Sequence, residues 1–228
     1  MSEHNKLHPF DFIIIYIGGA FIAGWLQQLL RQSFPAIAEG TVGLLLSGLW
    51  LQDGLMLALL VLCLRVRRAN WQDVGARCPE GRHPVLGPVL WGLAMYVSMT
   101  VMIQIINALW PGGLAAQNVQ GYMQPDDALW QKLFVVLTMG VFVPIVEELI
   151  FRGYLFHSLA ASASPQTAML FTALIFGAAH LDLQRFLPLA LGGYLLNIVA
   201  VRHRSTFASA ISHGVWNTVM IVLYYSAI

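Results

Sequence analysis

Two adjacent carboxylates stand in an apolar stretch of this chain, where a charge without a partner is costly. Glu147 and Glu148 follow the apolar residues 141–146, and Arg152 comes four residues after Glu148. A charged side chain at the centre of a bilayer costs roughly 2.5–3.5 kcal/mol even on a lenient insertion scale. The carboxylates are therefore expected to face a polar cavity, to pair with a cation or to share a proton.

Helical spacing assigns the two glutamates to different roles. Residues four apart share a helix face, so Glu148 and Arg152 are expected to form an ion pair. Glu147 points about 100° away from that face, so it stays free and can act as a general base that takes a proton from water. The alternative is that both are structural, with Glu148 neutralised by Arg152 and Glu147 protonated.

Two histidines and an asparagine extend the set of candidate catalytic residues. His180 follows Phe176 by four residues in apolar helical sequence, and Asn217 follows His213 by four. Taken singly, such residues are also common at membrane interfaces and in hydrogen bonds between helices. Together with the two glutamates, they are the parts of a hydrolase that works inside a membrane.

The composition indicates which class of protein must position these residues. The chain has 228 residues, of which 58% are hydrophobic and 10% are charged. Soluble domains carry about 25% charged residues, so the composition predicts a polytopic helical membrane protein. A net charge of +1 gives no reason to expect nucleic acid as a partner. Neither a CxxC motif nor a disulfide framework is present.

Seven apolar segments are expected to form one bundle of transmembrane helices around a polar cavity. A helix needs about 20 apolar residues to cross the hydrocarbon core. The predicted spans are 10–30, 41–64, 86–109, 129–156, 166–181, 186–201 and 207–227. The fourth is long enough to tilt or to kink near Pro144. The fifth and sixth are short, which predicts half-inserted helices or a tight polar turn between them.

Basic residues predict the orientation of the bundle. The loop after the second span should be cytoplasmic, because it contains five arginines: Arg65, Arg67, Arg68, Arg77 and Arg82. Residues 110–128 contain no Lys or Arg and should be external, and Arg202 and Arg204 return to the cytoplasm. A cytoplasmic N-terminus satisfies all three loops, whereas Arg31 does not fit this orientation.

The predicted spans and orientation place two candidate residues at different depths in the membrane. Glu147 falls toward the cytoplasmic half of the fourth span, while His180 lies near the external end of the fifth. The two can meet only if the fourth helix runs on past the membrane, or if the fifth reaches only partway. The chemistry favours the pairing, so we expect the span boundaries to be wrong.

Three motifs in this part of the chain resemble one family of intramembrane enzymes. Glu147, Glu148 and Arg152 form an EExxxR motif, Phe176 and His180 an FxxxH motif, and His213 and Asn217 an HxxxN motif. This set, in this order, resembles the CAAX-protease and bacteriocin-processing family of intramembrane endopeptidases. Residues 73–77 also resemble a common feature of its bacterial members.

The resemblance covers only part of the chain. We expect residues 1–228 to form one transmembrane domain, with a motif-bearing protease core at 141–225. Residues 1–85 supply N-terminal helices and a basic loop without a family motif, and substrate specificity is expected to depend partly on them. Asp53 interrupts the second span, and it is either a functional residue or a structural hydrogen-bonding group.

The resemblance implies a role for each motif residue. Glu147 and His180 would activate the attacking water, while His213 and Asn217 would stabilise the oxyanion. Glu148 with Arg152 would orient the site. A donor pair aimed at a developing oxyanion is worth several kcal/mol in a dry site, so the chemistry agrees with these roles.

Zinc is an alternative explanation for the same residues. Glu147, His180 and His213 could hold one zinc ion with water as the fourth ligand. The chain lacks HExxH, and its two histidines lie 33 residues apart (213 − 180). We favour a site without a metal or other cofactor, because Asn217 suits an oxyanion donor better than a group behind a zinc ligand.

The sequence therefore predicts an intramembrane endopeptidase of a prokaryotic cytoplasmic membrane. It would cleave a peptide bond near the C-terminus or membrane anchor of a protein or peptide, with membrane lipid as its surroundings. The rival from another class is a proton-coupled transporter or channel that uses the same carboxylates and histidines as a relay. Transporters often show internal repeats, and this sequence shows none. Which protein is cleaved, and in which oligomeric state, does not follow from the sequence.

Overall fold

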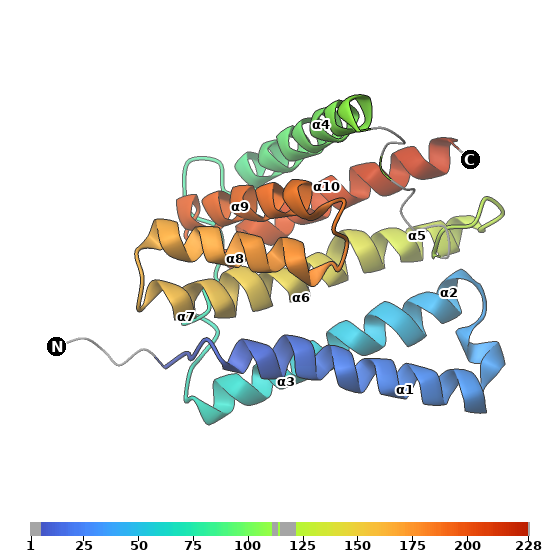
Figure 1. Cartoon of the computed structure of the whole chain (residues 1–228), viewed down its shortest axis with the longest axis horizontal. Coiled ribbons are helices and arrows are strands. Elements are labelled where there is room, and N and C mark those ends of the chain that lie inside the picture. Colours follow the sequence, from blue (N-terminus) through green and yellow to red (C-terminus); the bar gives the residue numbers. More distant parts are fainter. Residues whose placement is uncertain (1–5, 111–113, 115–121, 228) are drawn as a thin grey trace.

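The computed structural model describes residues 6–110, 114 and 122–227, and every regular element in these residues is helical (Figure 1). Five helical segments are long and apolar enough to cross a membrane, and two shorter apolar helices accompany them. The predicted class, a polytopic helical membrane protein, is confirmed. Part of the predicted external loop, residues 111–113 and 115–121, lies outside the described residues.

The first two spans form an N-terminal hairpin. Its first arm is η1 (Ile13–Gly18) followed by α1 (Gly19–Ser33), and the turn is η2 (Pro35–Ala38). Its second arm runs through α2 (Gly40–Leu45), η3 (Leu46–Trp50) and α3 (Leu51–Val66). The third span is α4 (Leu86–Leu109), with the predicted bounds.

The fourth span is one long helix with two π-helical segments. It comprises α5 (Leu129–Leu137), η5 (Thr138–Phe142), α6 (Val143–Glu148), η6 (Leu149–Leu155) and α7 (Phe156–Ala160). Pro144 is the second residue of α6, in its first turn. Proline has no backbone N–H to donate, so it is best tolerated in the first turn of a helical segment. Single π-turns of this kind occur often at functional sites, and η6 begins right after Glu148.

The last three helices are α8 (Pro165–Ala179), α9 (Phe186–Arg202) and α10 (Thr206–Ala227). Ser164 caps α8 by accepting a hydrogen bond from the Thr167 backbone N–H at 3.2 Å, and Pro165 occupies the first turn. Figure 1 shows α8 and α9 lying side by side, with the connection between them near the middle of the long axis of the bundle.

The short α8 resolves the depth conflict. With 15 residues it rises only about 22 Å, less than the roughly 30 Å hydrocarbon core. Glu147 lies 14 residues before Ala161 (161 − 147), and His180 lies 16 residues after Ser164 (180 − 164), on either side of one tight turn. The two residues therefore reach the same depth. Both residues line one cavity. The bounds of α8 differ from the predicted ones by only one and two residues, so the shortness of this helix, and not a large boundary error, accounts for the conflict.

Glycines allow the core helices to approach closely. A Cβ on Gly177 would lie 2.8 Å from the Phe186 carbonyl oxygen, and one on Gly193 would lie 3.0 Å from the Phe176 ring. A Cβ on Gly214 would collide with the Gly140 carbonyl in η5. Small residues at such crossings are how membrane helices pack without large side chains between them.

Polar contacts hold the N-terminal hairpin to the core. Arg67 donates two hydrogen bonds to Asp11, at 2.7 and 2.8 Å, and the Tyr154 hydroxyl donates a third at 2.5 Å. At the other end of the hairpin, the Thr41 hydroxyl donates to Asp127 at 2.7 Å. These contacts join residues that are far apart in the sequence.

The basic segments gather at one end of the bundle. There the Ser205 hydroxyl donates to the Arg77 carbonyl at 2.5 Å, and His203 Nδ1 donates to the Glu80 carbonyl at 2.9 Å. The Asp11–Arg67 pair lies at the same end (Figure 1). One common end is what the charge distribution predicts, and its cytoplasmic orientation stays a prediction.

Candidate active site

The second glutamate belongs to a fully buried cluster. Glu148 and Arg152 are both 0% exposed, and Arg152 Nη1 donates to Glu148 Oε1 at 2.8 Å. His213 Nδ1 donates to the same carboxylate oxygen at 2.9 Å. We call Glu148, Arg152 and His213 the buried cluster. The predicted ion pair four residues apart is present, with a histidine from α10 added to it.

The surroundings of Arg152 explain how a buried guanidinium is accommodated. Arg152 Nη2 donates to the Gly193 carbonyl in α9 at 2.9 Å, and its Cζ lies 4.4 Å above the Phe176 ring in α8. An aromatic face attracts a cation, most strongly where water is excluded. The Arg152 side chain thus contacts both α8 and α9.

The first glutamate faces a cavity of about 440 Å³ among α4, α6, α8, α9 and α10. Glu147 lines this central cavity with His180, His213 and Asn217, and so does Phe176 of the FxxxH motif. The predicted catalytic residues that should touch a substrate are therefore gathered around one space, although they come from three helices.

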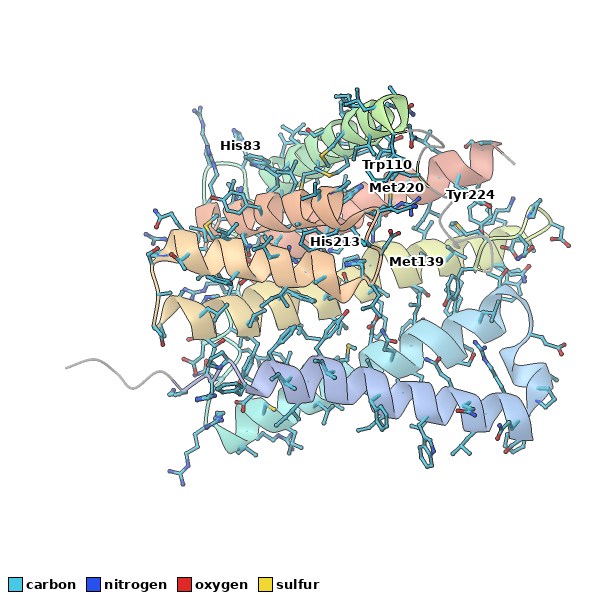
Figure 2. All side chains as sticks on the ribbon, in the orientation of Figure 1. His83, Trp110, Met139, His213, Met220 and Tyr224 are labelled. Atoms are coloured by element: carbon cyan, nitrogen blue, oxygen red, sulfur yellow. The ribbon has the colours of Figure 1, made fainter. Side chains whose placement is uncertain are left out.

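Apolar and methionine side chains form most of the remaining cavity wall, to which Arg185 and Thr100 also belong. Its lining includes Met99, Met139, Met220, Trp216 and Tyr224. Figure 2 shows His213 inside the bundle, Met139 and Met220 closer to the end at which α10 terminates, and Tyr224 closest to it. Flexible thioethers adapt to ligands of different shape, so the wall suits a peptide with apolar side chains.

Hydrogen bonds determine which nitrogens of the two histidines face the cavity. His180 Nδ1 donates to the Phe176 carbonyl at 2.9 Å, because a carbonyl can only accept. The neutral ring therefore has its lone pair on Nε2. His213 Nδ1 is used by Glu148, and its Nε2 lies 3.8 Å from Glu147 Oε2. Neutral His213 also has a lone pair on Nε2 and becomes a donor there only with a second proton.

Asn217 is held in place by the π-helical segment of the fourth span. Its Nδ2 donates to the Met139 carbonyl at 2.9 Å, and Met139 lies in η5. A carboxamide nitrogen carries two N–H groups. One amide hydrogen is thus used for positioning, and the second is available to an oxygen in the cavity.

The N-terminal hairpin contributes residues that sequence reasoning did not assign. The Tyr16 hydroxyl donates to the Ala179 carbonyl at 3.3 Å, next to His180. Asp53 is 3% exposed, and within the described part of the chain its Oδ2 has no hydrogen-bond partner. Asp53 belongs to α3, which packs against α6, the segment that carries Glu147. Only the intramembrane position of Asp53 signals this in the sequence; nothing marks Tyr16.

The zinc alternative requires three ligands around one point. Among the residues that the structure describes, no group of three His, Cys, Asp or Glu side chains is arranged to hold a metal ion. Glu147 and His213 approach each other, but His213 Nδ1 is already bonded to Glu148. The geometry does not present a ready zinc site, and the choice of a metal-free reaction stays a prediction.

Comparisons with known proteins agree with the motifs. Residues 129–219, which contain all six candidate catalytic residues, match the family model described as "Type II CAAX prenyl endopeptidase Rce1-like". A Bacillus subtilis protein named "Putative membrane peptidase YdiL" is 23% identical over 181 residues, covering 77% of this chain and 71% of the relative. No solved structure matches the chain. The resemblance to CAAX-protease-like enzymes is therefore confirmed over this segment, and both matches support a peptidase of the membrane.

Proposed function

We propose that this protein is an intramembrane endopeptidase that hydrolyses a peptide bond with water and without a metal. The observation that supports this most directly is the central cavity, where Glu147, His180, His213 and Asn217 meet in a mainly apolar wall that also includes Arg185. A transporter does not need a carboxylate, a histidine with an outward lone pair and an amide donor around one point, whereas peptide hydrolysis does.

In the proposed reaction, Glu147 and His180 Nε2 position a water molecule and remove its proton as its oxygen attacks the scissile carbonyl carbon. The carbonyl oxygen becomes an oxyanion, which accepts a hydrogen bond from the free N–H of Asn217. When the carbon–nitrogen bond breaks, the proton taken from water passes to the leaving amine. The products are a carboxylate and a new amine, and no redox partner is needed.

His213 is proposed to link the cavity to the buried cluster. Its Nδ1–H is fixed by Glu148, which Arg152 holds in turn, so the ring plane is fixed before substrate arrives. It aids the oxyanion when its Nε2 also carries a proton, and Glu147 lies 3.8 Å away to exchange one. Preorganised donors of this kind need no rearrangement during the reaction.

The substrate is proposed to be a protein or peptide whose cleaved segment lies near its C-terminus or membrane anchor. The cavity extends past Met139 and Met220 toward one end of the bundle, so an extended apolar segment fits it better than a folded domain. We propose the prokaryotic cytoplasmic membrane as its location, with the basic end inside.

One experiment tests the function and finds the substrate. The purified protein and its Glu147→Gln variant are incubated with a total membrane proteome, and new C-termini are mapped by mass spectrometry. We expect a small set of new termini that appear only with the parent protein. Identical maps from both proteins would contradict the proposal.

A further inference from the structure

A second pocket lies at the basic end of the bundle, away from the central cavity. It has a volume of about 520 Å³ and is formed by the loop before α4, the first half of α4 and the end of α9. Figure 2 places His83, at its rim, at the end of the molecule opposite Tyr224. Arg202 lies 13 residues beyond Leu189 of the central cavity (202 − 189), which is about 20 Å along α9.

The back wall of this basic pocket is fixed by hydrogen bonds. His203 Nδ1 donates to the Glu80 carbonyl at 2.9 Å, and the Glu80 backbone N–H donates to the His203 carbonyl at 2.9 Å. A Cβ on Gly87 would lie 3.0 Å from the His203 ring, so α4 packs directly against that ring. The pocket is thus part of the fold.

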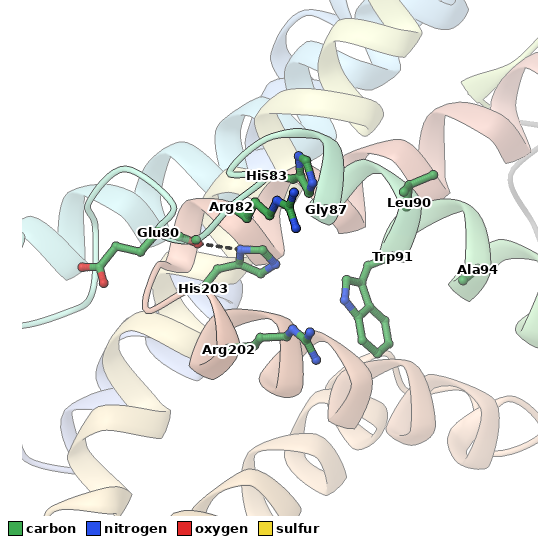
Figure 3. A pocket seen from close by; sticks show the side chains of 10 residues that line it. Glu80, Arg82, His83, Gly87, Leu90, Trp91, Ala94, Arg202 and His203 are labelled. Atoms are coloured by element: carbon green, nitrogen blue, oxygen red, sulfur yellow. Dashed lines mark hydrogen bonds between the residues drawn. The ribbon is translucent and has the colours of Figure 1, made fainter.

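Two arginines face this space without a partner. Figure 3 shows Arg82 and His83 on one side of the pocket and Arg202 on the other, with Trp91 beside Arg202. In the described part of the chain, no ion pair or side-chain hydrogen bond engages Arg82 or Arg202. The Glu80 carboxylate points away from His203 in Figure 3 and lies 3.7 Å from Arg204. The pocket is therefore positive and suits an anion.

The other wall of the pocket is apolar and continues into the outer surface of α4. Leu90, Trp91 and Ala94 line the pocket. Leu90 is 55% exposed, and farther along the helix Val97 and Val101 are similarly exposed. In a membrane helix, such a row of exposed apolar side chains faces lipid tails. An occupant therefore meets two arginines at one end and a hydrocarbon-facing groove at the other.

We propose that this pocket binds an anionic phospholipid, with its phosphate between Arg82 and Arg202 and an acyl chain along Leu90, Trp91 and Ala94. Basic pockets between helices on the cytoplasmic side are suited to such headgroups, and each arginine strengthens the attraction. The indole of Trp91 lies between the two regions, at the level where tryptophan favours the membrane interface. The apolar wall favours a lipid over free phosphate.

Lipid binding is tested on the full chain in neutral detergent. Thermal unfolding is followed while phosphatidylglycerol, phosphatidylcholine or inorganic phosphate is added. We expect phosphatidylglycerol alone to raise the midpoint in a saturable way, and Arg82→Gln/Arg202→Gln to weaken its apparent affinity about 10-fold or more. Arg65→Gln/Arg68→Gln, which removes the same charge from the same end, should respond like the parent.

The location is tested by fluorescence. Phosphatidylglycerol with brominated acyl chains should quench the emission of the parent more than that of Trp91→Phe, because Trp91 lines the proposed tail groove. Equal stabilisation by inorganic phosphate would instead show a small-anion site. Equal loss in both arginine pairs would show general charge attraction. Either result, or no stabilisation by phosphatidylglycerol, would overturn the proposal whether or not the protein is a peptidase.

Discussion

Glu147 and Glu148 are neighbours in one helix, yet the first faces the central cavity and the second belongs to the buried cluster, so their carboxylates have opposite surroundings. Glu148 is 0% exposed and receives hydrogen bonds from Arg152 and His213. Glu147 has a side chain that is 20% exposed, and His213 Nε2 lies 3.8 Å from its Oε2. The difference indicates that Glu148 maintains the site and that Glu147 is left free to react.

Breaking the buried cluster should have the largest effect. Arg152→Ala or Glu148→Ala leaves one charge buried without its partner, which costs roughly 3–5 kcal/mol. We expect both variants to lose folded protein as well as activity, as measured by thermal unfolding and by yield after purification. Arg31→Ala, which removes an exposed arginine, is the matched control and should behave like the parent.

Replacing both partners separates stability from activity. Glu148→Met/Arg152→Met removes the charges together, and a buried pair exchanged for apolar residues of similar volume is often tolerated. This variant should regain much of the lost stability but remain inactive, because His213 loses the acceptor that orients it. Stable, active single variants would show that the buried cluster has no structural role.

Changing the cavity-facing glutamate should have the reverse profile. Glu147→Gln keeps the shape but removes the base, so turnover should fall by about 10² or more while the unfolding temperature stays near that of the parent. The same substitution at the exposed Glu39 provides the control. Near-normal cleavage by Glu147→Gln would remove this residue from the mechanism.

Asn217 tests whether the cavity stabilises an oxyanion. Removing one such donor costs about 10²–10³ in turnover, and we expect Asn217→Ala to fall at the lower end, with substrate binding little changed. Turnover and binding are measured separately, the latter with an uncleaved substrate in the Glu147→Gln background.

The same assay decides between water activation with and without zinc. Chelator treatment should leave the activity of the parent intact, and elemental analysis should find no stoichiometric metal. One zinc per chain, lost with activity on dialysis and regained with it, would instead support the zinc mechanism, in which His213→Ala should also lose the bound metal. That result would replace the metal-free mechanism but leave the peptidase function in place.

A smaller effect is expected where the N-terminal hairpin meets the core. The Arg67 guanidinium, with the Tyr154 hydroxyl, holds the pKa of Asp11 below its usual range although burial opposes this, and the pKa of Arg67 is raised in return. A carboxylate with a lowered pKa stabilises the fold above its ordinary pKa, and that contribution disappears as the pH falls through the folded value. Asp11→Asn should therefore lower the unfolding temperature at pH 7, and the gap should close toward pH 3.

The sequence predicts the motif-bearing helices well because their signals are local. The seven apolar segments lie close to their predicted bounds, with the largest difference at the end of the fourth span, placed at 156 and observed at Ala160. The Glu148–Arg152 pair follows from helical spacing alone. The hydrogen bond between His213 and Glu148 was not predicted, because the residues lie 65 positions apart and the family resemblance placed them in one site without pairing them.

Contacts that depend on packing could not be predicted. The bounds of α8 lie within two residues of those predicted, but the sequence does not show how this short helix packs against its neighbours, and the depth of His180 depends on that packing. The Tyr154–Asp11 bond spans 143 residues and the Tyr16–Ala179 bond spans 163, and neither belongs to a recognisable motif. The sequence therefore indicated only that the N-terminal segment affects substrate specificity and that Asp53 is a candidate, and it did not predict how the hairpin contacts the core.

The shortness of α8 has a consequence for the bilayer itself. α8 has 15 residues and α9 has 17, so the two helices rise about 22 and 26 Å. Both are shorter than the hydrocarbon core of a typical bilayer. The bilayer beside these helices must become thinner, at a cost of fractions of a kcal/mol per Å of mismatch. The rate of peptide cleavage should then depend on acyl-chain length, rising in thinner vesicles in which His180 and the mouth of the cavity lie closer to water.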